Sequence, residues 1–201
     1  MKSDTIAAIA TALSDAGIGI IRISGPEAIA VANRVVVNKK KEHTLKNWQT
    51  HTIHYGFVEE NGTILDEVMV SVMKAPRSYT TEDTVEINCH GGVLLTKRVL
   101  EAVLHAGARM AEPGEFTKRA FLSGRIDLSE AEAVMDLIQA KNQFSMQASI
   151  KQLRGSVAEK VKSLRAALLY EIAFIESALD DPEHISCLLY TSDAADDLIG
   201  V

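Results

Sequence analysis

The chain has 201 residues, of which 47% are hydrophobic and 24% are charged, and its formal net charge is −6 at pH 7. This length allows one domain or two small ones, and no apolar run is long enough for a membrane-spanning helix. The negative charge argues against a broad basic surface for nucleic acid, but not against a local basic patch. The two cysteines are too few for a disulfide framework, and the six histidines lack metal-ligand spacing, so we expect a reducing compartment and no metal site.

Two strands are predicted near the N-terminus, one over residues 5–11 and a second over residues 17–24. The second has isoleucines on both of its alternating faces, which is typical of a fully buried strand. Arg22 interrupts this pattern, and an isolated charge in a buried strand costs much free energy. We therefore expect Arg22 either to form an internal salt bridge or to bind a ligand.

A helix is predicted after these strands, because Ser24 and Glu27 have the spacing of a capping box. Further along, Asn61-Gly62 is typical of a type I′ hairpin, and we expect it to join strands over residues 50–58 and 63–74. Alternate apolar residues of the second of these strands are expected to share one face: Ile64, Val68, Val70 and Val72.

A further strand over residues 84–90 is expected to bury Cys89, where a thiol is inert. Gly91-Gly92 then leads into an amphipathic helix that ends near Gly107, and a short strand over residues 108–111 follows. The glycine pair suits either a tight strand-to-helix turn or the binding of an anion by backbone N–H groups. The order of strands and helices predicts a mixed α+β domain.

The pattern becomes helical towards the C-terminus. Ser129 and Glu132 have capping-box spacing and predict the start of a helix. A longer helix is predicted over residues 153–179, where apolar residues recur at intervals of three and four and form a seam for another helix. Gly155 is a weak point in that helix. The sequence contains no Gly-x-x-x-x-Gly-Lys-Ser/Thr loop for binding phosphates.

Between these two parts, residues 113–134 interleave apolar side chains, such as Phe116 and Ile126, with charged ones, such as Arg119 and Arg125. A solvated loop does not need the apolar residues, and a core helix does not carry the charges. Both kinds suit a junction packed between two domains. That junction is either a structural hinge or a hinge that also lines a binding site.

The sequence of this junction, PGEFTKRAFLSGRIDLSEAEAV, resembles that of the MnmE (TrmE) family of tRNA modification GTPases. Three other segments resemble the same family and occur in the family's order. They are residues 4–11, residues 17–25 and residues 78–92, and the resemblance extends to about residue 186. It implies an aminomethyltransferase-like α+β domain over residues 1–118 and the first helices of an incomplete helical domain over residues 119–186.

In this family the N-terminal domain binds a tetrahydrofolate derivative, such as 5-formyl- or 5,10-methylenetetrahydrofolate. The resemblance implies that Arg22, Glu86 and Arg125 bind it here. The residue types fit this ligand, because a guanidinium suits carboxylates and a carboxylate accepts hydrogen bonds from an amino-pyrimidine edge. The chain departs from the family at Arg125, which is usually lysine, and at Thr81, which is commonly glycine. A TPPGRGG-like loop is also absent, with residues 11–17 in its place.

The resemblance further implies a cytoplasmic homodimer that acts with an FAD-dependent partner of the MnmG family and with tRNA, and not with a membrane. Together they add a carboxymethylaminomethyl group at C5 of the wobble uridine, with a one-carbon unit from tetrahydrofolate. The family's GTPase domain, which holds GTP, Mg²⁺ and K⁺, has no counterpart in this sequence, so we expect no catalytic residue and no GTP hydrolysis. The alternative is a stand-alone folate-binding and dimerisation module without catalysis.

Two expectations concern the C-terminal part. Residues 187–201 do not resemble the family and look like translated sequencing-adapter read-through, so we interpret them as a non-native tail. The helix before them lacks a full partner for its apolar seam, because the preceding helix covers only part of it. We therefore expect residues 143–181 to be frayed, self-associated or packed on a neighbouring molecule.

Overall fold

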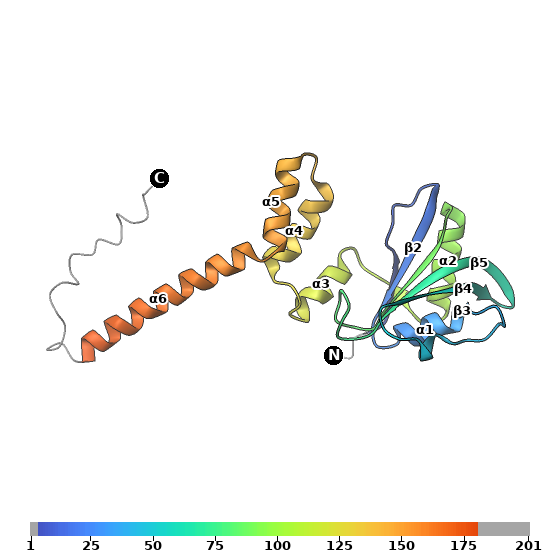
Figure 1. Cartoon of the computed structure of the whole chain (residues 1–201), viewed down its shortest axis with the longest axis horizontal. Helices are drawn as coiled ribbons and strands as arrows, with labels where there is room; N and C mark the ends of the chain where they lie inside the picture. The colour runs from blue at the N-terminus through green and yellow to red at the C-terminus, as the bar shows by residue number, and fades with distance from the viewer. Residues whose placement is uncertain (1–3, 181–201) are drawn as a thin grey trace. The chain divides into compact units, whose positions relative to one another are not determined.

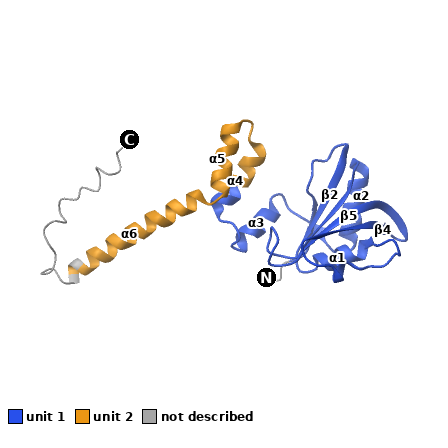
Figure 2. Ribbon diagram, in the orientation of Figure 1, with its two compact units in different colours: residues 1–132 blue, residues 133–201 orange. Residues whose placement is uncertain are grey.

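A computed structural model describes residues 4–180 of the chain, which divides into two compact units, Met1–Glu132 and Ala133–Val201 (Figure 2). The tail over residues 187–201 and the end of the family resemblance at residues 181–186 lie outside the described residues. No described helix is both long and apolar enough to cross a bilayer.

The first unit is built on a seven-stranded mixed sheet in the order β3-β4-β5-β6-β2-β1-β7 (Figure 1). Strands β1 and β7 pair in parallel, and all the other neighbours are antiparallel. The strands are β1 (Ile6–Ile9), β2 (Ala16–Ser24), β3 (Val36–Val37), β4 (Thr52–Glu60), β5 (Thr63–Met73), β6 (Thr84–Gly91) and β7 (Arg109–Met110). This arrangement confirms the predicted α+β class.

Helices α1 (Ala28–Val35) and α2 (Val93–His105) pack on one face of this sheet, with a short 3₁₀ helix at Leu45–Asn47. Alternate side chains of a strand point to opposite faces of the sheet. Every second strand residue therefore faces the two helices and packs with their apolar sides to form the core. The strand and helix residues of the core include Ile21, Ile23, Val70, Val72, Val85, Ile87, Cys89, Val31, Ala32, Val99 and Val103.

The opposite face of the sheet is open within the described residues, and the prediction that β2 is fully buried was wrong. Ile18 is 61% exposed, and Ile20 and Arg22 are half-buried on this open face. The helices cover one face only, so apolar residues on both faces did not indicate burial on both. Ile64 was also misplaced, since it is 42% exposed near the register shift between β4 and β5.

Both predicted capping boxes were wrong by a few residues. Ser24 does not cap α1; its hydroxyl donates to Glu82 (2.8 Å) and shares a hydrogen bond with Thr80 (2.6 Å). Helix α4 (Leu128–Gln139) is capped by Asp127, whose carboxylate accepts from the Glu130 N–H while the Glu130 carboxylate accepts from the Asp127 N–H, both at 2.8 Å. An aspartate satisfies the same pattern as the predicted serine.

Two predicted turns are confirmed. Asn61 and Gly62 both have positive φ, at 51° and 80°, as a type I′ turn requires. They join Glu60 of β4 to Thr63 of β5. Gly107, with φ of 113°, follows the end of α2, and its N–H donates to the Leu104 carbonyl.

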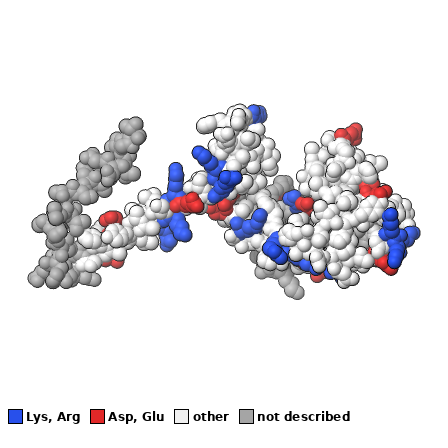
Figure 3. Space-filling view, in the orientation of Figure 1, with Lys and Arg blue, Asp and Glu red and all other residues white. Residues whose placement is uncertain are grey.

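The second unit holds most of α4 together with α5 (Gln143–Leu153) and α6 (Ser156–Asp180). The long helix predicted over residues 153–179 instead begins after a break at Gly155, whose φ of 78° a continuous helix does not allow. Figure 3 shows most of the visible surface of α6 as uncharged, with Lys and Arg gathered in its N-terminal half.

The apolar seam of α6 is well formed and uncovered within the described residues. Its side chains are between 42% and 77% exposed: Val157, Val161, Leu164, Leu168, Ile172, Ile175 and Leu179. The segment is helical up to Asp180, and fraying, self-association or packing of the seam on a neighbour stays a prediction.

Candidate functional site

Helix α3 (Glu115–Leu122) carries the centre of the junction segment and is held to the sheet domain by five charged side chains. Arg119 donates to both carboxylate oxygens of Glu82 (3.1 and 3.0 Å), to Asp4 (2.9 Å) and to Glu115 (3.0 Å). Arg109 contacts Glu115 through two nitrogens (2.9 and 2.6 Å) and also pairs with Asp4. We call these residues, Asp4, Glu82, Arg109, Glu115 and Arg119, the ionic cluster.

Two residues of the ionic cluster are largely buried, and its hydrogen bonds lower the pKa values of two of its carboxyl groups. The side chains of Arg119 and Glu115 are only 11% and 8% exposed, whereas that of Arg109 is 43% exposed. Hydrogen bonds from Arg109, together with those from the Glu112 N–H and from Arg119, lower the pKa of Glu115 to about 2. The pKa of Asp4 is lowered as well, chiefly by its hydrogen bond from Arg109.

The predicted site residues Arg22 and Glu86 meet on the open face of the sheet. They lie directly opposite each other on β2 and β6, and Arg22 Nε donates to Glu86 Oε1 over 2.7 Å. Their side chains are 33% and 21% exposed, so the expected salt bridge exists but is half-buried rather than deeply buried. The guanidinium carbon of Arg22 also lies 5.7 Å from the ring centre of Phe116 on α3.

This pair retains unused hydrogen-bonding capacity. The side chains of Arg22 and Glu86 make no further hydrogen bond within the described residues, so two guanidinium nitrogens and the second carboxylate oxygen are open to a ligand. Ser71 of β5 stands on the other side of Glu86 in the sheet register. The pair therefore offers donors and an acceptor side by side on an accessible surface.

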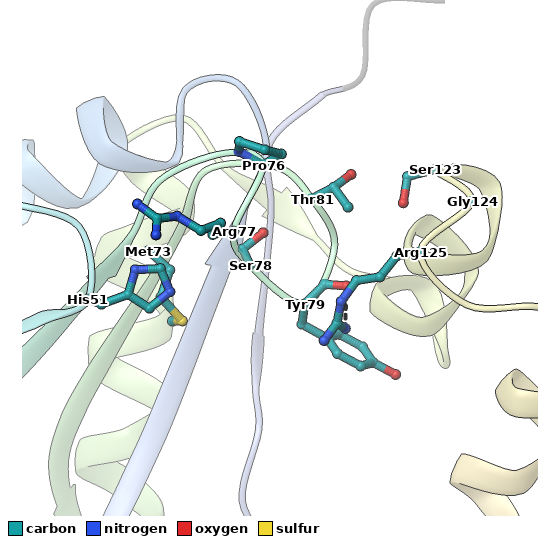
Figure 4. A pocket seen from close by; sticks show the side chains of 10 residues that line it. All are labelled: His51, Met73, Pro76, Arg77, Ser78, Tyr79, Thr81, Ser123, Gly124 and Arg125. Atoms are coloured by element: carbon teal, nitrogen blue, oxygen red, sulfur yellow. Dashed lines mark hydrogen bonds between the residues drawn. The ribbon is translucent and has the colours of Figure 1, made fainter. Parts of the chain in front are cut away.

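The third predicted residue, Arg125, does not contact this pair but lines a cleft of about 510 Å³ in the same unit (Figure 4). Its Nη1 donates to the Tyr79 carbonyl (3.0 Å), and its guanidinium lies 5.0 Å from the centre of the Tyr79 ring. Residues from before β4, from the end of β5 and the loop after it, and from the segment after α3 line the cleft: His51, Met73, Pro76, Arg77, Ser78, Tyr79, Thr81, Ser123, Gly124 and Arg125.

Helix α3 connects the cleft to the pair. Phe116 lies beside Arg22, and the next residue, Thr117, shares a hydrogen bond of 3.1 Å with the Tyr79 hydroxyl. Sequence reasoning singled out Arg22, Glu86 and Arg125, whose role as a binding site stays a prediction, and did not identify the cleft or the ionic cluster. The spacing of Glu115 and Arg119, four residues apart on one helix, was the available signal for the cluster.

Gly91-Gly92 and Cys89 are explained by structure alone. A Cβ added at Gly91 would lie 2.5 Å from the Ala16 carbonyl oxygen of β2, so this glycine allows two strands to approach closely. Cys89 is 3% exposed, its thiol donates to the Gly19 carbonyl (3.3 Å), and burial raises its pKa. These features favour the tight turn and the inert thiol.

Thr81, which stands where the family commonly has glycine, has a φ of 63°. A β-branched residue is strained in this left-handed region. We therefore expect Thr81→Gly to raise the free energy of unfolding by about 1 kcal/mol, after the greater freedom of glycine in the unfolded chain offsets part of the relief. Urea denaturation measures this change, and Thr81→Ala, which keeps the strain, should gain less. A less stable glycine variant would contradict the argument.

Comparisons with known proteins agree with the sequence motifs. The model of the "GTP-binding protein TrmE N-terminus" matches residues 5–125, and that of the "MnmE helical domain" matches residues 128–198. The tRNA modification GTPase MnmE of Lachnoclostridium phytofermentans is 58% identical over 200 residues, which are 100% of this chain and 44% of that protein. The proteins of the same name from Listeria welshimeri and Carboxydothermus hydrogenoformans are 52% and 51% identical over 92% of this chain and 40% of their own length.

The chain thus spans less than half the length of these relatives. The helical-domain match and the Lachnoclostridium match both run into residues 187–201. The non-native origin of that tail stays a prediction.

Proposed function

Because the chain belongs to the family of the tRNA modification GTPase MnmE, or TrmE, we propose that it forms the folate-binding and dimerisation part of such an enzyme. In this proposal residues 1–118 bind a reduced folate and residues 119–186 begin the helical domain. The complete protein acts in the cytoplasm with an FAD-dependent MnmG-family partner. It adds a carboxymethylaminomethyl group at C5 of the wobble uridine of certain tRNAs, and hydrolyses GTP with Mg²⁺ and K⁺ bound outside the present chain.

The Arg22–Glu86 pair is the observation that carries the folate proposal. A pterin ring presents neighbouring N–H donors and a carbonyl, which match the open carboxylate oxygen of Glu86 and the open nitrogens of Arg22. Phe116 adds an aromatic ring beside the guanidinium. Without a ligand, the charges of Arg22 and Glu86 neutralise each other. The empty site therefore lowers the stability of the folded chain little.

When bound, tetrahydrofolate supplies the one-carbon unit. The residues of this chain would bind and orient it rather than react: Glu86 accepts from the pterin edge, and Arg22 holds Glu86 and donates to the ligand. Arg125, held against Tyr79, is placed to meet the acidic end. We assign no catalytic residue and no metal ligand to this chain.

The homodimer proposal rests on the open face of the sheet. Large apolar side chains are exposed on strands β2, β4 and β5 of this face: Ile18, Ile53, Tyr55 and Met69, at 61%, 63%, 42% and 45%. A cluster of exposed apolar residues commonly marks a protein interface. A second copy of this domain would cover these four side chains.

Titration calorimetry of the 201-residue chain with 5-formyltetrahydrofolate tests the folate proposal. We expect saturable binding of one ligand per chain, and no heat from GTP, since the sequence has no phosphate-binding loop. Sedimentation at micromolar concentration should give a dimer. The absence of folate binding at millimolar ligand would reject the site, and a monomer would reject the interface.

A further inference from the structure

The cleft beside Tyr79 is lined by cationic and neutral side chains and by no carboxylate. Arg77 and Arg125 stand on either side of the loop that carries Ser78 and Tyr79, and His51 lies near Arg77 (Figure 4). The chain has a net charge of −6, so the charge of this lining is opposite in sign to that of the protein as a whole. It suits an anionic ligand.

Both arginines have free donors. The side chain of Arg77 is exposed and makes no hydrogen bond or ion pair within residues 4–180. Arg125 uses only Nη1, in its bond to the Tyr79 carbonyl, and stacking on the Tyr79 ring fixes the guanidinium plane. A guanidinium that is held in place but not neutralised is ready to pair with a carboxylate.

The neighbouring carboxylates are already engaged. Asp83 accepts from the Ala75 N–H (2.8 Å), and Glu82 is paired with Arg119 of the ionic cluster. Asp127, two residues after Arg125, caps α4. None of these three lines the cleft within the described residues, so a ligand in it would meet the two arginines and no carboxylate.

One lining residue of the cleft, Met73, lies on the same open face of the sheet as the Arg22–Glu86 pair. Met73, which lines the cleft, lies two residues along β5 from Ser71, and Ser71 is opposite Glu86. Two residues of a strand span about 7 Å, and both side chains point to the same face. A ligand with its head at Glu86 can therefore extend past Met73 into the cleft.

We propose that this cleft binds a row of carboxylates, the γ-linked oligoglutamate tail that extends a folate beyond its first glutamate. The inference rests on the proposed folate binding at the Arg22–Glu86 pair. It adds that Arg77, Arg125 and the open side of the cleft select folates by tail length. The monoglutamate reaches the nearer arginine, and each further glutamate adds one carboxylate within reach of the remaining donors.

The effect is modest because the pairs are exposed to solvent. The one further exposed ion pair, with the arginine that the monoglutamate does not reach, favours the pentaglutamate over the monoglutamate by up to about fivefold. Salt screens such pairs, so the preference should shrink as ionic strength rises. The cleft is therefore expected to change the ratio of the affinities for the pentaglutamate and the monoglutamate, and not the affinity for the monoglutamate.

The test measures dissociation constants of the 201-residue chain for 5-formyltetrahydrofolate with one and with five glutamates, at low salt. We expect the wild-type chain to bind the pentaglutamate about fivefold more tightly. In Arg77→Ser this ratio should fall to about twofold or less, with the monoglutamate affinity unchanged. Lys40→Ser, which removes an exposed cation that does not line the cleft, should keep the wild-type ratio.

The outcomes separate this inference from the proposed function. If neither folate binds, the proposed function fails. If both bind equally well, the folate site stands and the tail site is overturned. A ratio of one combined with weaker binding of single-stranded RNA by Arg77→Ser than by Lys40→Ser would assign the cleft to an RNA phosphate backbone, and would also overturn the inference.

Discussion

Glu86→Gln is expected to weaken the binding of 5-formyltetrahydrofolate by about 2–5 kcal/mol. The amide keeps the shape of the side chain but removes the negative charge that faces Arg22 at 2.7 Å. It also replaces one acceptor oxygen with a donor that opposes the N–H groups of a pterin. Titration calorimetry gives the change directly, and Arg22→Ala should cause a loss of similar size.

A matched control separates this effect from a general change in surface charge. Glu67→Gln removes a carboxylate from the exposed part of β5, where Glu67 accepts from the Tyr55 hydroxyl and does not touch the pair. It should bind folate as the wild-type chain does. Arg22→Lys should bind more weakly than wild type, because an ammonium cannot contact Glu86 and a ligand through a planar fork. Equal affinity in all of these variants would place the folate elsewhere.

The sequence predicted the residues of this pair but not that they meet. Arg22 and Glu86 are 64 positions apart, and their contact depends on the register of β2 against β6. Alternation of apolar residues identified both strands, but register is set by pairing across the sheet, which a single sequence does not display. The open face of β2 was predicted as buried for another reason. Isoleucine occurs both in cores and on exposed apolar surfaces, so residue type alone does not show which face is covered.

The helical part shows a different limit. The seam spacing was correct for α6, but Gly155 ended the preceding helix rather than weakening a continuous one, because glycine readily adopts the positive φ found there. The cap of α4 was predicted at Ser129, two residues after the observed cap at Asp127, because residue type alone does not distinguish serine from aspartate at this position.

The second large effect is expected in the ionic cluster. Glu115→Gln should lower the free energy of unfolding of the first unit by about 2–3 kcal/mol, because it removes the charge-assisted hydrogen bonds that the buried Glu115 carboxylate accepts, while Asp4 and Glu82 still pair with the two arginines. Glu115 accepts from Arg109, Arg119 and the Glu112 N–H, and Arg119 is only 11% exposed. Urea denaturation followed by the fluorescence of Trp48, the sole tryptophan and part of the first unit, reports this change.

Glu112→Gln is the control for this measurement. Glu112 is exposed, lies in the same turn, and contributes its backbone N–H rather than its carboxylate to the cluster. Its substitution should change the free energy of unfolding by less than about 0.5 kcal/mol. If Glu112→Gln destabilised the chain as much as Glu115→Gln, the loss would come from a general charge effect at the start of α3 and not from the cluster.

The pH dependence identifies the carboxylate itself. The pKa of Glu115 is about 2 in the folded chain, against an ordinary value of 4.5, so the folded state binds this proton less readily than the unfolded state. Its stabilisation is complete above pH 4.5 and is lost as the pH falls towards 2. The gap in stability between wild type and Glu115→Gln should therefore be full at pH 7 and narrow steadily below pH 4.5. A gap that stayed constant down to pH 2.5 would mean that glutamine disturbs the packing of α3, and that the ion pairs with Arg109 and Arg119 contribute little to holding it.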